Sequence, residues 1–595
     1  MDRSACRKQE RGVGMVLAVR GGVGIRRATA CLTMAFLLWQ IVWAVVTPGF
    51  RTPDEPAHYN SVLRMATTGQ WPAPGEAALT QTVVDAVRES GLTTVEQDLF
   101  SQANRSEVAG GDVQANGGDV LPYPDALVVE HGQRSVGMYS DAEATGEKDQ
   151  MTQHPPLYYW LAGKALRLAG GMEWTWDRQL LFLRIFSIFL TAPLVPCLVY
   201  TACRLGAGRR CALAIAATIF LVPQLAFNTA AVTNDDLAIG AGAVAIAASA
   251  AVAYSGSWYT VFASGAALGV GLWSKGTFIP MGLVVGCAFL VNPRIGTRGR
   301  RLLRALAAGG VGVLLGGFWW GRNLVLYGVL QPAGLERTQS GEGSDVLYFI
   351  QASLRGLADT SWGRFGWLEF PLPQPLLLAL QVGVLVCVTW AVTHAWVPEG
   401  GTEQARDDRL RRAVLILFYP ATGALLIVQA WTAYTQTGTL PGLQGRYLFP
   451  AVVGMLAVAG MAWAPRLERT GERNWPYMIP GILSSSVAGY SLLLWLRACY
   501  PAEEGWLGID WLRWSVVSGL GLWWLRLAVV LGAVMLLVAV LTPFLFRDGR
   551  ARGDGGRAKA LSPAPAIREK DGDAVQQTAR VERPVREGYR SEERG

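Results

Sequence analysis

The chain has 595 residues, of which 51% are hydrophobic and only 16% are charged, and its formal net charge is +8. A soluble domain carries roughly 25% charged residues. The low charge and a mean hydropathy of +0.26 therefore exclude a disordered chain and argue against a soluble enzyme. They are typical of a protein that crosses a membrane many times. Nucleic acid is not an expected partner, because membrane proteins gather Lys and Arg on the cytoplasmic side for topological reasons.

Apolar stretches long enough to cross a bilayer recur along the chain. A hydrocarbon core of about 30 Å needs about 20 apolar residues per helix. The pattern predicts an all-α polytopic membrane protein with about 12 transmembrane helices, within a range of about 11 to 14. The predicted spans are 29–47, 180–203, 210–227, 236–254, 258–273, 277–292, 303–321, 375–397, 412–432, 447–464, 477–496 and 523–546.

The distribution of arginine predicts the orientation, because short connections rich in Lys and Arg face the cytoplasm. With twelve spans, all such connections fall on one side together with the N-terminal Arg20, Arg26 and Arg27. We therefore expect both termini in the cytoplasm. The expected parts are a basic segment 1–28, a membrane domain 29–546 and a basic, disordered tail 547–595. Residues 155–170 then form a helix at the outer interface, because one more crossing would invert every later connection.

Three long segments are predicted to lie outside the membrane, namely 48–179, 322–374 and 497–522. Residues 48–155 hold 16 acidic and 6 basic residues, a net charge of −10, so the rest of the chain carries +18. Within the first outer loop, 80–150 is polar and Gly-rich and is expected to be a variable insertion with little secondary structure. The polar residues gather at the outer ends of the spans, unlike those of a transporter with two related halves.

The first motif, TPDEPAHY at 52–59, directly follows the first span. Asp54 and Glu55 are adjacent carboxylates in a turn stiffened by two prolines. Because consecutive side chains point to different sides, one carboxylate can act as a base while the other orients a ligand or a metal. A simpler interpretation stays open, in which Asp54 caps a juxtamembrane helix and Glu55 lies in its first turn. His58 of the same motif is a candidate substrate-binding residue.

Three further motifs lie at predicted outer ends of spans. QHPPLYYW at 153–160 begins an aromatic helix typical of a membrane interface, a role that leaves His154 unexplained. The turn TNDD at 233–236 contains Asp235, which could also be a helix cap. Lys275 is the only Lys or Arg in its short external turn. It can contact lipid phosphates in general or bind one specific phosphate.

External arginines are few, and three stand beside aromatic residues. Arg322 lies in WWGRN at 319–323, Arg364 in SWGRFGW at 361–367 and Arg446 in LQGRYLFP at 443–450. Each can simply anchor a helix at the interface. Together they would form a cationic outer pocket opposite the acidic pair, with Gln444 and Tyr447 as further substrate-binding candidates.

A cationic pocket and a carboxylate on an outer surface favour one kind of chemistry. No nucleotide sugar or ATP is available there, whereas a donor with a phosphate head and a lipid tail is supplied by the membrane. Lys275 and the arginines would bind the phosphate, and a carboxylate would deprotonate an acceptor hydroxyl for attack at the anomeric carbon. Inversion needs one base and no covalent intermediate, and cations stabilise the departing phosphate.

In their order and one-sided placement these motifs resemble the GT-C glycosyltransferases that use polyprenyl-phosphate sugars. The chain is similar to protein O-mannosyltransferases and lipid A aminoarabinose transferases, and most similar to the bacterial membrane-protein family DUF2142. The resemblance is carried, between about 50 and 450, by PDEPAHY at 53–59, HPPLYYW at 154–160, RIFS at 184–187, NDD at 234–236, WSKG at 273–276 and QGRYLFP at 444–450.

The resemblance implies a GT-C-like fold in the plasma (inner) membrane with an extracytoplasmic active site. It implies that Asp54 is the catalytic aspartate, that Glu55 is its acidic neighbour, and that Lys275 matches a lysine of the aminoarabinose transferases. His154 stands where those enzymes carry a basic residue. No soluble domain is expected after 546, so membrane loops must bind the acceptor. Metal dependence varies in the superfamily and the sequence requires none; Asp54, Glu55 and His154 are the candidate ligands of a divalent metal.

The sequence thus predicts an inverting hexosyl- or pentosyltransferase that moves a sugar from a polyprenyl phosphate to a glycan, lipid or protein acceptor of the cell envelope. Asp54 is the predicted general base, and Lys275, Arg322 and Arg446 are the predicted phosphate-binding cations. Two alternatives use the same pocket. A transporter or flippase for a lipid-linked saccharide predicts functional charges near the midplane, and a polymerase or ligase of surface polysaccharide predicts a diphosphate-linked donor.

Overall fold

The computed structural model describes residues 23–91, 128–252, 255–334, 343–394, 401–438, 440, 443–470 and 473–546, with only the backbone described at 401–404. The tail 547–595, most of segment 1–28 and the middle of 80–150 lie outside these residues. The described part is built from helices and two small antiparallel sheets. The sheets pair β1 (Ala78–Thr80) with β2 (Ala144–Lys148) and β3 (Arg364–Phe365) with β4 (Phe370–Pro371). The all-α membrane architecture is confirmed.

Long apolar helices form the body of the described chain. Eight segments there are long and apolar enough to cross a membrane: Gly24–Val46, Trp176–Arg204, Asp235–Val252, Arg298–Tyr327, Gln374–Thr393, Ala405–Thr437, Trp475–Cys499 and Leu522–Leu545. Three shorter apolar helices are Trp258–Leu272, Gly276–Leu290 and Gly445–Gly460. The remaining predicted span, 210–227, is divided into α9 (Arg209–Ala217), η5 (Thr218–Leu221) and α10 (Pro223–Asn228). Within the described residues, every predicted span therefore coincides with helices, whereas the number of crossings stays a prediction.

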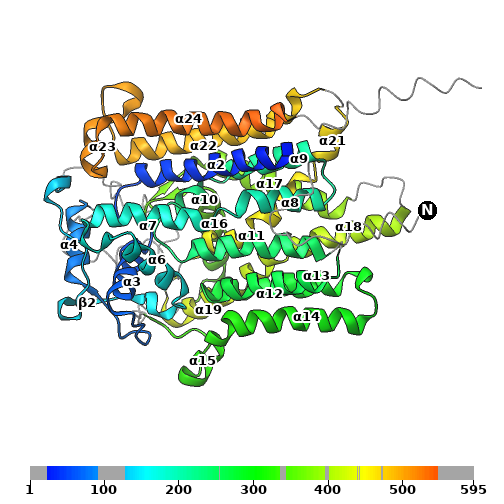
Figure 1. The fold of residues 1–595 in the computed structure, drawn as a ribbon, viewed down its shortest axis with the longest axis horizontal. Helices are drawn as coiled ribbons and strands as arrows, with labels where there is room; N and C mark the ends of the chain where they lie inside the picture. The colour runs from blue at the N-terminus through cyan, green and yellow to red at the C-terminus, as the bar shows by residue number, and fades with distance from the viewer. Residues whose placement is uncertain are drawn as a thin grey trace, which may run out of the picture. The chain divides into compact units, whose positions relative to one another are not determined.

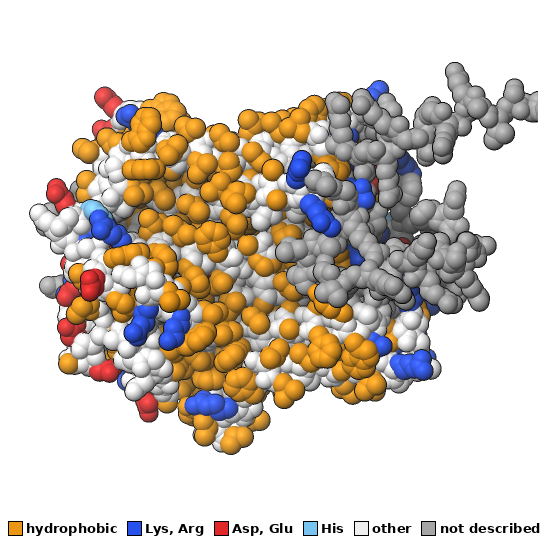
Figure 2. Space-filling model, in the orientation of Figure 1, with side chains coloured by type: hydrophobic (Ala, Val, Ile, Leu, Met, Phe, Trp, Pro, Cys, Tyr) orange, Lys and Arg blue, Asp and Glu red, His pale blue; other side chains and the backbone are white. Residues whose placement is uncertain are grey.

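Neighbouring long helices pack side by side (Figure 1). Contacting pairs include α2 with α24, α22 with α24, α11 with α12 and α12 with α14. Their bounds are α2 (Val23–Val46), α11 (Asp235–Val252), α12 (Trp258–Leu272), α14 (Arg298–Gly312), α22 (Ile479–Cys499) and α24 (Leu522–Leu545). Figure 2 shows hydrophobic side chains over the middle of this body and acidic side chains at one end. Such a surface suits helices surrounded by lipid.

Short helices gather at that acidic end, where Figure 1 shows α3 (Glu55–Thr68), α4 (Gln81–Glu89) and α6 (Leu157–Leu168). The helix expected after the first motif is α3, and the one expected at 155–170 is α6. The two pack closely, because a Cβ on Gly163 of α6 would lie only 3.0 Å from the backbone nitrogen of Ala66 of α3. The described flanks of 80–150 differ from the expectation of little secondary structure, since they form α4 and β2.

A buried ion pair holds the end of the first loop against α3. Asp149 Oδ2 accepts hydrogen bonds from Asn60 Nδ2, Ser61 Oγ and Arg64 Nη2, each at 2.8 Å. Its Oδ1 accepts from the backbone N–H of Met151 at 3.0 Å, which starts η3 (Gln150–Gln153). A single carboxylate therefore attaches residues 149–154 to a helix whose contacting residues lie 85 to 89 positions before Asp149 in the chain.

Arg64→Met should destabilise the protein by roughly 3 kcal/mol or more, because it leaves the Asp149 carboxylate buried without its cation. The matched control is Arg88→Met. It breaks an exposed ion pair between Arg88 and Asp85, whose side chains are 60% and 46% exposed, respectively. The free energy of unfolding should fall by less than about 1 kcal/mol. Thermal unfolding of the two purified variants in the same detergent tests this. Equal changes in the two variants would show that the Arg64–Asp149 pair does not hold the loop.

Candidate functional site

The turn that leads into α3 has an unusual backbone. Phe50 and Asp54 have φ angles of 61° and 64°, the left-handed region that residues other than glycine rarely adopt. Strain of this kind costs roughly 1 to 3 kcal/mol and persists where the surroundings over-determine it. Asp54 occupies the N-cap position of α3 and Glu55 its first turn, but the Asp54 side chain makes no capping hydrogen bond. The carboxylate points instead toward distant parts of the chain.

Two side chains from distant segments meet the Asp54 carboxylate. Arg446 Nη2 donates to Oδ2 at 2.6 Å, and Gln150 Nε2 donates to Oδ1 at 3.0 Å. The Asp54 side chain is 19% exposed and that of Arg446 is 8% exposed. Asp54 therefore remains accessible to a small reactant, while its cationic partner is buried.

A second ion pair adjoins the first. Lys275 Nζ donates to Asp235 Oδ1 at 2.5 Å, and Arg446 Nε lies 3.8 Å from Asp235 Oδ2. The four side chains thus alternate in charge in the order Asp54, Arg446, Asp235, Lys275, and we call them the charge row. The ring of Tyr447 lies against both cations, with its centroid 4.8 Å from Lys275 Nζ and 5.4 Å from the Arg446 guanidinium carbon.

Local backbone links bring the members of the charge row together. Asn234 Nδ2 donates to the carbonyl of Ser274 at 3.0 Å, and Ser274 Oγ donates to the carbonyl of Asn234 at 2.7 Å. This reciprocal pair joins the residue before Asp235 to the residue before Lys275. Arg446 lies in η9 (Gly445–Ala451), which the N–H of Gly445 attaches to Thr360 Oγ1 of α16 (Val346–Trp362) at 2.7 Å.

Glu55 lies in a different environment from Asp54. Its buried carboxylate accepts from Arg184 Nε at 2.8 Å and from Arg184 Nη2 at 2.6 Å, and also from the N–H of Val232 at 3.0 Å. The same guanidinium donates to the carbonyls of Ala44, Thr47 and Pro48 at the end of α2. The two adjacent carboxylates therefore do point apart, and that of Glu55 joins α2, α3 and α7 (Trp176–Leu190).

Two histidines lie close to the charge row. His58 Nδ1 is 2.9 Å from the hydroxyl of Tyr159, and the two rings stack. His154 is buried, and its Nδ1 has no hydrogen-bond partner among the described residues. Burial, followed by the positive charge of Lys275, lowers the pKa of His154 to about 3. The same two causes hold the pKa of His58 well below its usual range, so both imidazoles are neutral at neutral pH.

Three further predicted site residues have other surroundings. Arg322 is exposed on α15 (Phe318–Tyr327), with its guanidinium 4.7 Å from the Trp319 ring, and it forms no ion pair within the described chain. Arg364 Nε donates to the carbonyl of Leu368 at 2.5 Å, within the hairpin of β3 and β4. Gln444 is buried directly before η9. The structure thus brings Asp54, Asp235, Lys275, Arg446 and Tyr447 together, with the two histidines beside them.

The sequence interpretation missed Gln150 as a partner of Asp54 and Arg184 as the partner of Glu55. No sequence feature singles out Gln150, because it lies in a polar stretch without periodicity. Arg184 is recognisable in the sequence, since an arginine in the middle of an apolar stretch is costly unless it is paired. No three His, Cys, Asp or Glu side chains in the described part of the chain are grouped as a metal site would need, Asp54, Glu55 and His154 included.

Comparisons with known proteins concern both sequence and fold. A family model described as "Predicted membrane protein (DUF2142)" matches residues 37–455. No functionally curated protein matches the chain. ArnT from Cupriavidus metallidurans, solved with undecaprenyl phosphate, is 14% identical with a TM-score of 0.40, covering 87% of this chain and 76% of its own. Its apo form is 16% identical at the same score and coverage.

A further solved structure is the archaeal oligosaccharyltransferase AglB from Archaeoglobus fulgidus, in complex with an inhibitory peptide and a dolichol-phosphate. It is 13% identical with a TM-score of 0.31, and the match covers 80% of this chain and 56% of AglB. These scores are too low for the details of either site to be transferred.

The pKa of His154 predicts an acid-sensitive fold. The folded protein favours the neutral form of His154. Between about pH 3 and pH 6.5, the imidazole of the unfolded chain therefore binds more protons than that of the folded protein. The stabilisation is therefore full above pH 6.5 and is lost as the pH falls. Between pH 7.5 and 5, His154→Gln should remove about 2 kcal/mol of the acid-induced loss of stability seen in the wild type.

Thermal unfolding at several pH values measures this difference. The control is His394→Gln, which makes the same replacement at an exposed histidine at the end of α17 (Gln374–Thr393). A wild-type slope that persists in His154→Gln would contradict the burial of a neutral imidazole beside Lys275.

Proposed function

The chain belongs to the DUF2142 family of membrane proteins, and we propose that it transfers a sugar from a polyprenyl phosphate to an acceptor at the end of the helices that carries α3 and α6. One observation carries this proposal. Asp54 is an accessible carboxylate in a strained turn, and it contacts Arg446, one of the two buried cations that flank Asp235 in the charge row. A base next to a binding site for a phosphate leaving group is what glycosyl transfer from such a donor requires.

Asp54 is proposed as the general base. Its side chain is the most exposed of the ion-paired members of the charge row, so an acceptor hydroxyl can reach it. Gln150 fixes Oδ1, and the hydrogen bonds around Asp149 fix Gln150. The base is thereby oriented before any substrate binds, which is how positioned groups lower a barrier.

Lys275 and Arg446 are proposed to bind the donor phosphate. A polyprenyl-phosphate sugar is a phosphodiester with one negative charge, and its phosphate gains a second charge when the sugar leaves. In the structure both cations are paired with carboxylates. A phosphate between them would compete with Asp54 for Arg446. Donor binding would therefore release Asp54 from its ion pair at the moment when the base is needed.

The proposed reaction takes place in a single displacement step. The acceptor oxygen forms a bond with the anomeric carbon, the bond between that carbon and the phosphate oxygen breaks, and the acceptor proton moves to Asp54. The products are an inverted glycoside and a polyprenyl phosphate, whose dianion Lys275 and Arg446 stabilise. A phosphate leaving group needs no acid, because it departs as an anion.

The remaining residues are proposed to support this step. Asp235 orients both cations, and Tyr447 covers them with its ring. The unpartnered Nδ1 of neutral His154 is suited to a hydrogen bond with a sugar hydroxyl, and His58 and Gln444 would line the same region. We assign Glu55 a positioning role through Arg184. Arg322 and Arg364 are weaker candidates for the phosphate than Lys275.

We further propose that this end of the protein faces the outside of a bacterial inner membrane, with both termini in the cytoplasm. The net charge of −10 on residues 48–155 supports this orientation, because positive connections favour the cytoplasmic side. A lipid-linked donor is the sugar source available on that side. The acceptor would then be a glycan, lipid or protein of the cell envelope.

Asp54→Asn should lower the rate of sugar transfer by about 10²- to 10⁴-fold, since it removes the base while keeping the size of the side chain. The assay is transfer from labelled polyprenyl-phosphate hexoses and pentoses in membranes that contain the protein. Asp85→Asn on the exposed face of α4 is the control and should retain full activity. Equal turnover by the wild type and Asp54→Asn would remove Asp54 from the mechanism.

Lys275→Gln should lower kcat by about 10²- to 10³-fold, because the cation acts mainly on charge that develops as the phosphate leaves. Lys148→Gln is the control, since Lys148 is exposed on β2. A change in KM alone would assign Lys275 to donor binding without catalysis. Movement of the lipid-linked sugar across vesicles without product would instead indicate a flippase, and activity only with diphosphate-linked donors would indicate a polymerase or ligase.

A further inference from the structure

A second cationic region lies away from the charge row, at the C-terminal ends of three helices. A small cavity, open to the surroundings on one side, lies between the ends of α8 (Leu194–Arg204), α11 and α13 (Met281–Leu290) and the side of α18 (Gly401–Ile416). Its walls are apolar and consist of Leu205, Ala250, Ala288, Val291, Val414 and Leu415. Its polar lining residues are Arg204, Arg411, Ser249 and Asn292.

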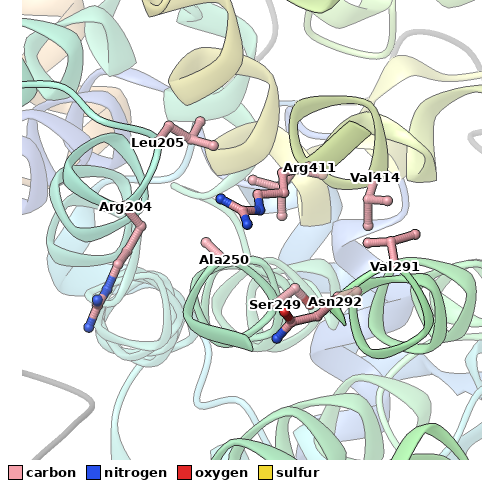
Figure 3. A pocket seen from close by; sticks show the side chains of 10 residues that line it. Arg204, Leu205, Ser249, Ala250, Val291, Asn292, Arg411 and Val414 are labelled. Carbon is pink, nitrogen blue, oxygen red and sulfur yellow. The ribbon is translucent and has the colours of Figure 1, made fainter. Parts of the chain in front are cut away.

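The polar side chains divide between the rim and the inner wall. Figure 3 shows Arg411 reaching from α18 across the cavity toward Leu205, with Ser249 beside Asn292 on the opposite wall. Arg411 also pairs with Asp408 of its own helix at 3.2 Å. Ser249 is buried, and its hydroxyl has no hydrogen-bond partner among the described residues. An unsatisfied buried hydroxyl is costly unless a ligand or water completes it.

The surroundings of the cavity are strongly basic. The connections at this end contribute arginines at 204, 209, 210, 294, 298, 300 and 301, and α18 adds those at 409, 411 and 412. The described acidic side chains nearby are Asp407 and Asp408 of α18 and Glu468, which accepts from the N–H of Gly208. Arginine prevails at this end, so the region attracts anions.

The Arg204 side chain points away from this cavity, toward a neighbouring apolar pocket (Figure 3). Its guanidinium carbon lies 4.9 Å from the ring centroid of Tyr200. Tyr200 lines a second pocket with Cys197, Val244, Ala248, Ala251 and Ala263, on the opposite face of α11. Two apolar pockets thus lie on opposite faces of α11, each next to an arginine of a neighbouring helix. Apolar walls beneath cations suit a molecule with a phosphate head and acyl chains better than a free phosphate.

We propose that this cavity binds an anionic glycerophospholipid, with the head-group phosphate at Arg411 and an acyl chain along the apolar wall. The Ser249 hydroxyl would donate to a head-group or ester oxygen. Basic pockets between membrane helices are a known kind of site for such head groups. The site is separate from the charge row, and the proposal does not depend on the proposed transfer reaction.

Native mass spectrometry of the full-length protein in detergent tests this proposal, with phosphatidylglycerol, phosphatidylcholine and inorganic phosphate as three separate probes. We expect phosphatidylglycerol to bind at least about fivefold more tightly than phosphatidylcholine. Arg411→Gln should weaken phosphatidylglycerol binding about fivefold. The control is Arg298→Gln, because Arg298 is exposed on α14 and does not line the cavity, and it should change little.

A second variant keeps the charge and fills the space. Ala250→Leu narrows the wall and should also weaken phosphatidylglycerol binding, which carries the test if Arg411→Gln fails to fold. Equal weakening by Arg298→Gln would indicate a diffuse surface potential and overturn the proposal. Inorganic phosphate that displaces the lipid at millimolar concentration would indicate an anion site without lipid specificity. Unchanged lipid binding in both cavity variants would overturn the proposal. The arginines would then only offset the negative partial charge at the C-terminal ends of the helices.

Discussion

The candidate site depends on one buried ion pair, between Glu55 and Arg184. The guanidinium donates to both oxygens of Glu55 and to three carbonyls at the end of α2, while Glu55 also accepts from the N–H of Val232. The end of α2, the start of α3, the middle of α7 and the backbone at Val232 therefore meet at this ion pair. Because Glu55 is fixed there, the residue before it must complete a tight turn, and Asp54 takes a left-handed conformation with its carboxylate directed away from α3. An isolated buried charge would be prohibitively costly, so each member of the pair requires the other.

The charge row is built on this turn from segments that are distant in sequence. Asp54 comes from the first loop, Asp235 from the start of α11, Lys275 from the turn after α12 and Arg446 from η9. Each is positioned by neutral hydrogen bonds in its own neighbourhood, such as those between Asn234 and Ser274. The row contains two carboxylates and two cations, so it is stable without a ligand and can exchange a carboxylate for a phosphate without leaving a net excess of buried charge.

Much of the fold could be predicted from sequence because it depends on composition over long windows. All twelve predicted spans coincide with helices, and so do the two expected helices at the outer loop, α3 and α6. The flanks of 80–150 could not be predicted, because Asp149 orders them through contacts with Asn60, Ser61 and Arg64 rather than through a periodic pattern. The site was predicted in part. Charged residues at span ends are visible in a sequence, whereas the pairing of Asp54 with Arg446 and of Glu55 with Arg184 is set by tertiary packing alone.

The proposed mechanism requires a donor phosphate to take the place of Asp54 at Arg446. A cryo-electron microscopy structure of the protein with a non-transferable polyprenyl-phosphate sugar analogue tests it most directly. We predict the phosphate within hydrogen-bond distance of Lys275 Nζ and the Arg446 guanidinium, with Asp54 released from Arg446 and facing the anomeric carbon. A phosphate bound elsewhere, with the ion pairs of Asp54 with Arg446 and of Asp235 with Lys275 both intact, would contradict this exchange.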